Sequence, residues 1–544
     1  MSLSSYIAAC GGFTNISRIL APDQRLIIEV FDADLFTPTA MIQSVDLVQE
    51  YQQYTFARPE TLSQHELLSA GEQLALQQHS RIEPHQSPVE CEYRPKWHIS
   101  PPQGLLNDPN GFVYHQGQYH LFYQWYPYTC EHKDKYWAHL VSDDLIDWHW
   151  RPVALTPSHA FDSHGAFSGH AVSQGNELML FYTGNTRIGP QRDRHTTQCV
   201  AVSSDGIEFH KRGPVVSQLP EGVTAHIRDP KVVHIDNQWL MLLGAQTEQL
   251  QGRIAVYRSN DLSDWHFEGL FGQELGEFGY MWECPDLFEL GGETFAVVCP
   301  QGVASFSAKN TIPHHNGIAK ATWSSEQGLL LREFVHLDHG FDFYAPQTLL
   351  TPQGKRVMCA WMGVPDEIDQ PSADNGWVHQ LTCMRELSYR DGQLIQWPLA
   401  QLDNLAGETE HVTLSGQTYD PQTKSFDLQL SLTEGSELQL FADGHYHLSL
   451  RFDNQVLILD RSATLNRAQD TQRELPVEGD KVELRILADT SSAEIFVNQG
   501  AAVLTTRVFT PELARAIRLI GEPQSATLKT LRPALAPFQV STTK

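Results

Sequence analysis

Short β-type runs dominate the chain from about residue 91 to residue 405. Trp, Tyr, Phe and Val gather in stretches of a few residues, and Gly, Pro, Asn or Asp separates these stretches about every ten residues. Strands rich in aromatic and β-branched side chains show this pattern. No helix-period pattern longer than about three turns interrupts it. The pattern therefore predicts an all-β domain over residues 91–405.

A cleaner alternation of apolar and polar residues begins after about residue 405. Leu428, Leu430 and Leu432 alternate with polar residues, and so do Ile495 and Val497. Half-buried antiparallel strands alternate in this way. Residues 406–544 are therefore predicted to form a C-terminal β-sandwich packed against the preceding domain, and the acids near residues 489–498 are interpreted as parts of a strand and a turn.

Residues 1–90 are predicted to form a small α+β extension of unknown role. Leu26–Phe31 is a short β-rich run, and Ser63 with Glu66 has the spacing of a capping box at the start of a helix. The pattern assigns no chemistry to this extension. A segment that simply packs on the main domain is preferred over an accessory or dimer-contact role, and a homo-oligomer is left open.

A repeat of about sixty residues runs through the central β-rich region. Three Ser-x-Asp segments, at residues 142–148, 203–209 and 259–265, begin 61 and 56 residues apart. A period near this length in β-rich sequence is typical of propeller blades of about four strands each. The fold class predicted is all-β: a five-bladed β-propeller followed by a C-terminal β-sandwich, with a small N-terminal α+β extension.

Polar residues recur at one phase of this repeat. Asp108, Ser168, Asp229, Glu283 and Asp342 are 60, 61, 54 and 59 residues apart. Taken alone, the Asn-Asp-Pro-Asn-Gly segment around Asp108 is typical of a tight turn. Residues at the same phase of successive blades surround the central axis of a propeller, so these side chains are expected to converge on one cavity.

Charge and composition exclude several other classes. The chain has 38 basic and 65 acidic residues, a net charge of −27, which argues against nucleic-acid and anionic-membrane partners. The first residues lack a secretory signal and no window has the length of a membrane span, so a cytoplasmic protein is expected. Eight scattered cysteines are expected to be free thiols, and the 25 histidines form no metal-binding motif, so neither a metal nor another cofactor is expected.

Carboxylates that face one cavity can cleave a glycosidic bond if one is ionised and another carries a proton. Asn107 and Asn110 flank Asp108, and their amides are expected to favour its charged form and keep its pKa low, as a nucleophile requires. Glu283 lies between a tryptophan and a Cys-Pro pair, and this apolar setting is expected to raise its pKa, as a general acid/base requires.

Asp229 directly follows Arg228 in the sequence. A carboxylate paired with a guanidinium stays ionised, which suits the stabilisation of positive charge on a sugar ring better than proton transfer. Asp229 is therefore assigned to transition-state stabilisation.

Seven short motifs follow one another in the central region: WHISPPQGLLNDPNG (97–111), FYQ (122–124), WAHLVSDDL (137–145), FSG (167–169), FYTG (181–184), RDP (228–230) and WECPD (282–286). Together they resemble glycoside hydrolase family 32, the β-fructofuranosidases, over about residues 95–400. Residues 491–498 and 506–509 resemble the C-terminal sandwich of that family. Residues 1–90 carry no such resemblance.

The resemblance implies a five-bladed propeller, no metal, and retention of configuration through a fructosyl-enzyme ester. It agrees with Asp108 as nucleophile, Asp229 as transition-state stabiliser and Glu283 as acid/base. It also implies a fructose pocket formed by Asn107, Gln124, Phe167, Ser168, Arg228, Tyr344 and Trp361.

One segment departs from the family pattern. Members of the family usually carry a tryptophan a few residues before a Trp-Gly-His motif, but here the segment reads Glu-His132-Lys133-Asp and the glycine of the motif is Ala138. Either His132 or the nearby Trp125 is expected to take the place of the missing aromatic wall.

The function expected is hydrolysis of the terminal β-D-fructofuranosyl bond of sucrose to glucose and fructose. Hydrolysis of sucrose 6-phosphate is the alternative, and it requires a basic cluster that Lys133 with Lys135, or Arg187 with Arg192 and Arg194, could supply. Short fructans are a third candidate substrate, although the lack of a secretory signal counts against external polymers. An enzyme acting on arabinose polymers is disfavoured by the Asn-Asp-Pro-Asn-Gly and Glu-Cys motifs. A non-catalytic fructoside-binding protein should lack one of the three acids, and all three are present.

Overall fold

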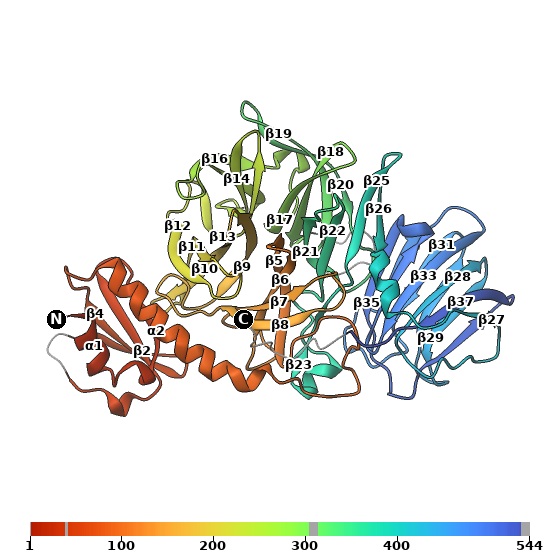
Figure 1. Cartoon of the computed structure of the whole chain (residues 1–544), viewed down its shortest axis with the longest axis horizontal. Helices are drawn as coiled ribbons and strands as arrows, with labels where there is room; N and C mark the ends of the chain where they lie inside the picture. Colours follow the sequence, from red (N-terminus) through yellow and green to blue (C-terminus); the bar gives the residue numbers. More distant parts are fainter. Residues whose placement is uncertain (1, 39–41, 304–313, 535–544) are drawn as a thin grey trace.

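The computed structural model describes residues 2–38, 42–303 and 314–534. They form a small α+β unit at one end, a five-bladed β-propeller in the middle and a β-sandwich at the other end (Figure 1). This is the fold class predicted from the sequence, and the prediction is confirmed. None of the described helices has the length and apolar surface needed to cross a membrane.

The described N-terminal residues form a four-stranded antiparallel sheet, in the order β1-β2-β4-β3, against which helices pack. The predicted capping box is confirmed, because the Ser63 hydroxyl accepts from the backbone N–H of Glu66 and the Glu66 carboxylate accepts from the backbone N–H of Ser63. The elements are α1 (Leu3–Ala9), β1 (Ile16–Leu20), β2 (Arg25–Val30), β3 (Ile42–Val48), β4 (Tyr51–Ala57) and α2 (Gln64–Ile82).

The propeller blades are sheets of four strands that follow one another in the chain, each supplying one inner strand. The first blade also pairs β5 with the short parallel strand β23 (Trp377–Val378), and β24 (Gln380–Leu381) adds to the last blade. The first three blades contain β5 (Gly104–His115), β6 (Gln118–Tyr126), β7 (Tyr136–Ser142), β8 (His149–Leu155), β9 (Ala166–Gln174), β10 (Glu177–Ile188), β11 (Asp193–Ser203), β12 (His210–Val216), β13 (Val223–Ile235), β14 (Gln238–Thr247), β15 (Gly252–Ser259) and β16 (His266–Phe271). The last two contain β17 (Met281–Leu290), β18 (Glu293–Gln301), β19 (Gly317–Ser324), β20 (Gly328–His336), β21 (Tyr344–Leu350), β22 (Arg356–Met362), β25 (Arg385–Arg390) and β26 (Gln393–Pro398).

The inner strands β5, β9, β13, β17 and β21 contact one another in cyclic order, and β21 closes the ring on β5. A proline lies in four of them: Pro109, Pro230, Pro285 and Pro346. Each coincides with a shift in the register of pairing to the next strand. Proline is tolerated on an edge strand or at a bulge, and a bulge redirects the neighbouring side chain. The Asn-Asp-Pro-Asn-Gly segment is therefore a bulged inner strand and not the isolated turn that its composition suggests.

The sandwich consists of a six-stranded and a five-stranded sheet that enclose a core of leucine, isoleucine, valine and phenylalanine side chains. The first sheet has the order β27 (Glu410–Leu414), β37 (Gln524–Thr530), β28 (Phe426–Thr433), β33 (Lys481–Asp489), β34 (Ser492–Val497) and β35 (Ala502–Arg507). The second has the order β32 (Gln472–Pro476), β31 (Val456–Asp460), β30 (Leu448–Asp453), β29 (Ser436–Ala442) and β36 (Ala516–Ile520).

A buried ionic network joins the propeller to the sandwich. His98 lies between Asp489 and Glu494, with each ring nitrogen 3.0 Å from a carboxylate oxygen. Arg385 binds Glu494 at 2.6 Å and Asp338 at 3.1 Å. Asp489 and Glu494 therefore hold the two domains together, a role that their assignment to a strand and a turn did not predict. The eight cysteines are free, as predicted.

Candidate active site

Three inner strands place Asp108, Asp229 and Glu283 in the wall of one cavity of about 1240 Å³. Carboxylates more than a hundred residues apart in sequence thus meet at the propeller axis. The same cavity is lined by all seven residues expected to bind the sugar: Asn107, Gln124, Phe167, Ser168, Arg228, Tyr344 and Trp361.

Asp342 is the exception to the convergence expected from the repeat. It is fully buried, and its carboxylate accepts from Arg461 and from the backbone N–H of Arg507, both at 2.8 Å and both in the C-terminal half of the chain. The fifth blade presents Tyr344 to the cavity instead. Tyr344 precedes Pro346 by two residues, as Glu283 precedes its own proline, so the bulge and not the residue count sets which side chain faces the axis.

Asp108 accepts a short hydrogen bond from the hydroxyl of Ser168, which comes from the neighbouring inner strand. The thiol of Cys284 lies 3.7 Å from a carboxylate oxygen of Asp108 and 3.7 Å from one of Asp229. Burial and the charge of Glu283 raise the pKa of Asp108, although the hydrogen bond from Ser168 opposes this shift. The expectation of a low pKa from the flanking asparagines is therefore wrong for the free protein.

Glu283 is surrounded by hydrogen-bond donors. Arg228 donates through Nε and Nη2 to Oε1, at 2.9 and 2.6 Å, while Tyr344 and Gln301 donate to Oε2 at 2.8 and 2.7 Å. Burial alone would raise the pKa of Glu283, but Arg228 and Tyr344 outweigh it and hold the pKa below its ordinary value. The expected apolar setting is wrong because successive side chains of a strand point to opposite faces, and Trp282 is directed into the core.

Asp229 accepts a hydrogen bond at 3.0 Å from the backbone N–H of Cys284. Burial raises its pKa to about 7, with Glu283 and Asp108 adding to the shift and Arg228 opposing it. The ion pair expected between Arg228 and Asp229 is replaced by the pair between Arg228 and Glu283. Below about pH 7, a proton on the three carboxylates is therefore expected to lie on the aspartate side of the cluster and not on Glu283.

Of the two residues considered for the missing aromatic wall, His132 lines the cavity and Trp125 does not. The ring of His132 meets Trp361 edge-on, with 5.9 Å between the ring centroids. Trp125 is fully buried and donates to the backbone oxygen of Gln103 at 2.7 Å, so it lies in the core. Nζ of the buried Lys135 lies 3.1 Å from Nδ1 of His132, and burial lowers the pKa of Lys135 to about 7.

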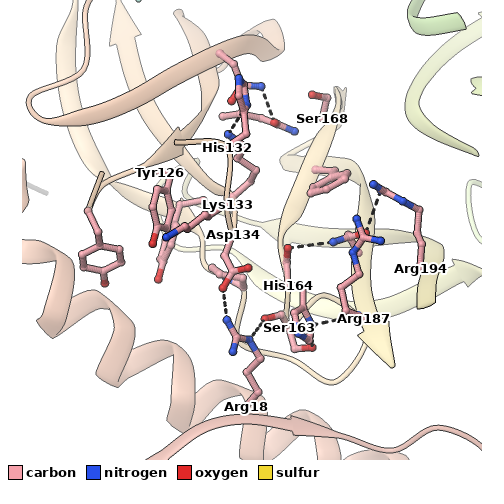
Figure 2. A pocket seen from close by; sticks show the side chains of 18 of the residues that line it. Arg18, Tyr126, His132, Lys133, Asp134, Ser163, His164, Ser168, Arg187 and Arg194 are labelled. Atoms are coloured by element: carbon pink, nitrogen blue, oxygen red, sulfur yellow. Dashed lines mark hydrogen bonds and ion pairs between the residues drawn. The ribbon is translucent and has the colours of Figure 1, made fainter. Parts of the chain in front are cut away.

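Both basic clusters considered from the sequence line the cavity. Lys133 forms an exposed ion pair with Glu131 at 2.9 Å. Arg187 and Arg194 are cross-strand neighbours in the hairpin of β10 and β11 (Figure 2). Arg192 lies just before β11. No described carboxylate forms an ion pair with any of these three arginines.

Two family models match the chain in succession. The model described as "Glycosyl hydrolases family 32 N-terminal domain" matches residues 98–398, and the one described as "Glycosyl hydrolases family 32 C terminal" matches residues 400–533. The chain belongs to glycosyl hydrolase family 32. The resemblance inferred from the seven motifs is confirmed, and the protein is a glycoside hydrolase with a sugar substrate.

Relatives in this family cover most or all of the chain. A "Probable sucrose-6-phosphate hydrolase" of Psychromonas ingrahamii is 55% identical over 99% of this chain and 100% of its own length. The solved structure of sucrose-6-phosphate hydrolase from Lactobacillus gasseri has a TM-score of 0.78 at 28% identity and covers 87% of this chain and 100% of that chain. A Bombyx mori family 32 beta-fructofuranosidase mutant in complex with sucrose has a TM-score of 0.75 at 30% identity, over 88% of this chain and 99% of that chain.

Sequence reasoning missed part of the cavity wall in this family 32 chain. Gln301 donates a hydrogen bond to Glu283 but belongs to none of the seven sequence motifs. Arg18, Tyr51 and Arg81 of the N-terminal unit also line the cavity, although the family models begin only at residue 98. No sequence signal connects these residues with the propeller, because the contact joins segments that are distant in the chain.

Proposed function

We propose that the protein hydrolyses the β-D-fructofuranosyl bond of sucrose 6-phosphate with retention of configuration, releasing fructose and glucose 6-phosphate. The observation that carries this proposal is the group of three arginines, Arg187, Arg192 and Arg194, in the wall of the cavity that holds the three acids. Sucrose fits the same fructosyl pocket and is expected to be the poorer substrate, because it lacks the anion that these guanidinium groups would bind.

The charge of the cavity supports an anionic substrate. Eight arginine and lysine side chains and five carboxylates line it, and three of those carboxylates are the proposed catalytic acids. The chain as a whole has a net charge of −27. A basic cavity in an acidic protein attracts anions selectively, because the field is concentrated where the low-dielectric walls converge. The substrate is thus expected to carry negative charge.

The arginine group lies next to the fructosyl pocket. The guanidinium carbon of Arg194 lies 5.6 Å from the ring centroid of Phe167, and its Nη1 donates to the side-chain oxygen of Asn185 at 3.2 Å. Its buried Nε has no hydrogen-bond partner within the described part of the chain. Burial, together with the charges of Arg228 and Arg187, lowers the pKa of Arg194 to about 9. Cations placed so close together without carboxylates are stabilised by a bound phosphate, which guanidinium groups bind in a bidentate manner.

The second basic cluster is the weaker candidate for phosphate binding. Lys133 is about half exposed and already paired with Glu131. Lys135 is buried and directed to His132 beside the fructosyl pocket. Several relatives, at up to 55% identity, are named sucrose-6-phosphate hydrolase or probable sucrose-6-phosphate hydrolase, and these names support sucrose 6-phosphate as the substrate.

The three acids would divide the chemistry between them. Asp108 attacks the anomeric carbon of the fructosyl unit while Glu283 protonates the glycosidic oxygen, and glucose 6-phosphate leaves. Glu283 then takes a proton from water, which attacks the fructosyl-enzyme ester and frees Asp108. Asp229 stabilises the positive charge that develops on the ring.

The proton must be on Glu283 when the reaction begins. In the free protein Arg228 keeps Glu283 ionised. Fructosyl hydroxyls that accept from Arg228 would take these hydrogen bonds away from Glu283, raise its pKa and draw the shared proton from the aspartates.

The test is a comparison of kcat/KM for sucrose 6-phosphate and for sucrose. The native protein is expected to prefer the phosphate, and Arg194→Gln should reduce kcat/KM for sucrose 6-phosphate by about 10- to 100-fold, since a charged hydrogen bond contributes about 1.5–3 kcal/mol. The value for sucrose should change far less. Arg212→Gln is the matched control, because Arg212 is an exposed arginine of β12 outside the cavity. Equal values for the two substrates in the native protein would contradict the proposal.

A further inference from the structure

The N-terminal unit forms part of the wall of the substrate cavity. Nine of the residues that line the cavity belong to the segment from Thr14 to Arg81. The three acids and the seven proposed sugar-binding residues all come from the propeller, and they occupy the fructosyl end at its axis. The N-terminal unit therefore faces the remaining part of the cavity, which the leaving group must occupy.

Arg18 connects the N-terminal unit to the propeller at the cavity wall. Its Nε donates to the backbone oxygen of Ser163 at 2.9 Å, and one terminal nitrogen forms a short ion pair with Asp134 (Figure 2). The other terminal nitrogen forms a short ion pair with Glu29. Ser163 and Asp134 both line the cavity. Glu29 belongs to the N-terminal sheet and is almost fully buried. The guanidinium group of Arg18 therefore binds both the N-terminal sheet and the propeller residues of the cavity wall.

Helix α2 forms a second contact between the N-terminal unit and the propeller. Gln78 donates to the backbone oxygen of Pro157 at 3.0 Å, and Glu72 lies 3.8 Å from the ring of His159. The helix packs so closely that a Cβ on Gly71 would lie 2.3 Å from the His159 ring. Because the contacts occur at both the sheet and the helix, the unit is positioned on the propeller and is not loosely tethered to it.

We propose that the N-terminal unit is a specificity element that contacts the leaving-group half of the substrate, and that Arg18 is the positioning residue that fixes it over the cavity. Arg81 and Tyr51 are the polar side chains with which it would meet the leaving group. Arg81 lies with its guanidinium 4.3 Å from the Phe31 ring, and no described carboxylate forms an ion pair with it. The inference rests on the proposed function only in the identity of the leaving group, which is glucose 6-phosphate if that function is correct.

The proposal is tested with substrates that share the fructosyl unit but differ in the leaving group. Sucrose 6-phosphate, sucrose and methyl β-D-fructofuranoside form such a series, since the methyl group is too small to reach the N-terminal wall. The main variant is Arg18→Met with Glu29→Gln, because the second change avoids leaving a buried carboxylate without its cation. Arg81→Met removes a wall cation without touching the connection.

In both variants, the ratio of kcat/KM for sucrose 6-phosphate to kcat/KM for methyl β-D-fructofuranoside is expected to fall by about tenfold, the size expected for a lost charged contact. The control is Arg58→Met. Arg58 lies in the same unit, its guanidinium donates to the backbone oxygens of Ala21 and Asp23, and it is not among the residues that line the cavity. Thermal melting confirms that each variant is folded.

Two outcomes would overturn the inference: an unchanged ratio in both variants, or a loss of the same size for all three substrates. The outcome is independent of the proposed function. If the native protein shows no preference for sucrose 6-phosphate over sucrose, that function fails, yet the ratio of sucrose to methyl β-D-fructofuranoside still reports whether the N-terminal unit contacts the leaving group.

Discussion

Arg228 donates two hydrogen bonds to Glu283, at 2.9 and 2.6 Å, although Asp229 is its neighbour in the chain. This relationship sets the resting charge of the cavity. Glu283 is held ionised by the guanidinium, while burial and the neighbouring carboxylates raise the pKa of Asp229 to about 7. In the proposed mechanism, a proton held on the aspartate side below about pH 7 passes to Glu283 before the glycosidic bond is broken.

The pH dependence of kcat/KM follows from this shared proton. The carboxylate cluster loses its last proton near the raised pKa of Asp229, about 7. Above that pH no proton is available for the glycosidic oxygen, so kcat/KM is expected to fall with a macroscopic pKa near 7. Asp229→Asn removes one repelling carboxylate and should move this basic limb to lower pH. A profile that stays flat to pH 9 would show that the cluster does not supply the proton.

Asp108 is the nucleophile in this account, and its amide variant tests that role. Asp108→Asn is expected to reduce kcat by at least about 10⁴-fold, because no other carboxylate can form the covalent intermediate. The variant should keep the native melting temperature, since the amide still accepts from the Ser168 hydroxyl. Activity within about tenfold of the native value would remove Asp108 as the nucleophile.

Lys135 is expected to influence the ionisation of Asp108. It is buried in the cavity wall beside His132, and its charge lowers the pKa of Asp108. Lys135→Met should therefore raise the pKa of Asp108 and shift the acidic limb of the kcat/KM profile to higher pH. Lys133→Met is the control, because Lys133 pairs with Glu131 at the exposed rim. The same shift in both variants would exclude a specific role for Lys135.

His98 links stability to pH at the interface between the propeller and the sandwich. Burial lowers its pKa, but hydrogen bonds to Asp489 and Glu494 outweigh this, so the pKa of His98 is raised above 6.5. The resulting stability is fully present below pH 6.5, where the unfolded chain is also protonated, and it is lost as the pH rises through the folded-state pKa. His98→Gln should reduce the free energy of unfolding by about 3–5 kcal/mol at pH 6 and by less at high pH. Denaturant unfolding at a series of pH values measures this, and an equal loss at every pH would mean that folding does not raise the pKa of His98.

Much of the architecture could be predicted because local patterns of apolar, polar and turn-forming residues determine its strands. Each repeat of about sixty residues corresponds to one propeller blade, and the alternation of apolar and polar residues identifies the strands of the sandwich. The proline bulges bring Asp108, Asp229 and Glu283 to the axis, so their shared phase in the repeat was informative. Asp342 shows that the spacing along the repeat does not by itself identify a cavity residue. In its blade Tyr344 lines the cavity, and Asp342 is buried and accepts a hydrogen bond from Arg461.

The electrostatic expectations failed because neighbours in sequence are not neighbours in space. In a strand, adjacent side chains point to opposite faces, so Trp282 says little about the surroundings of Glu283. The hydrogen-bond donors to Glu283 are Arg228, Gln301 and Tyr344, which come from three other strands. Likewise, the contact between Arg18 and Asp134 joins residues 116 positions apart, and no periodicity of the chain encodes it.

The most direct test of the proposed function is a crystal structure of the Asp108→Asn variant with sucrose 6-phosphate bound. The account predicts that the phosphate lies within hydrogen-bond distance, about 3 Å, of the guanidinium groups of Arg187 and Arg194. The anomeric carbon should lie about 3–3.5 Å from the side chain at position 108. A phosphate bound at Lys133, or one that projects into solvent away from the arginines, would contradict it.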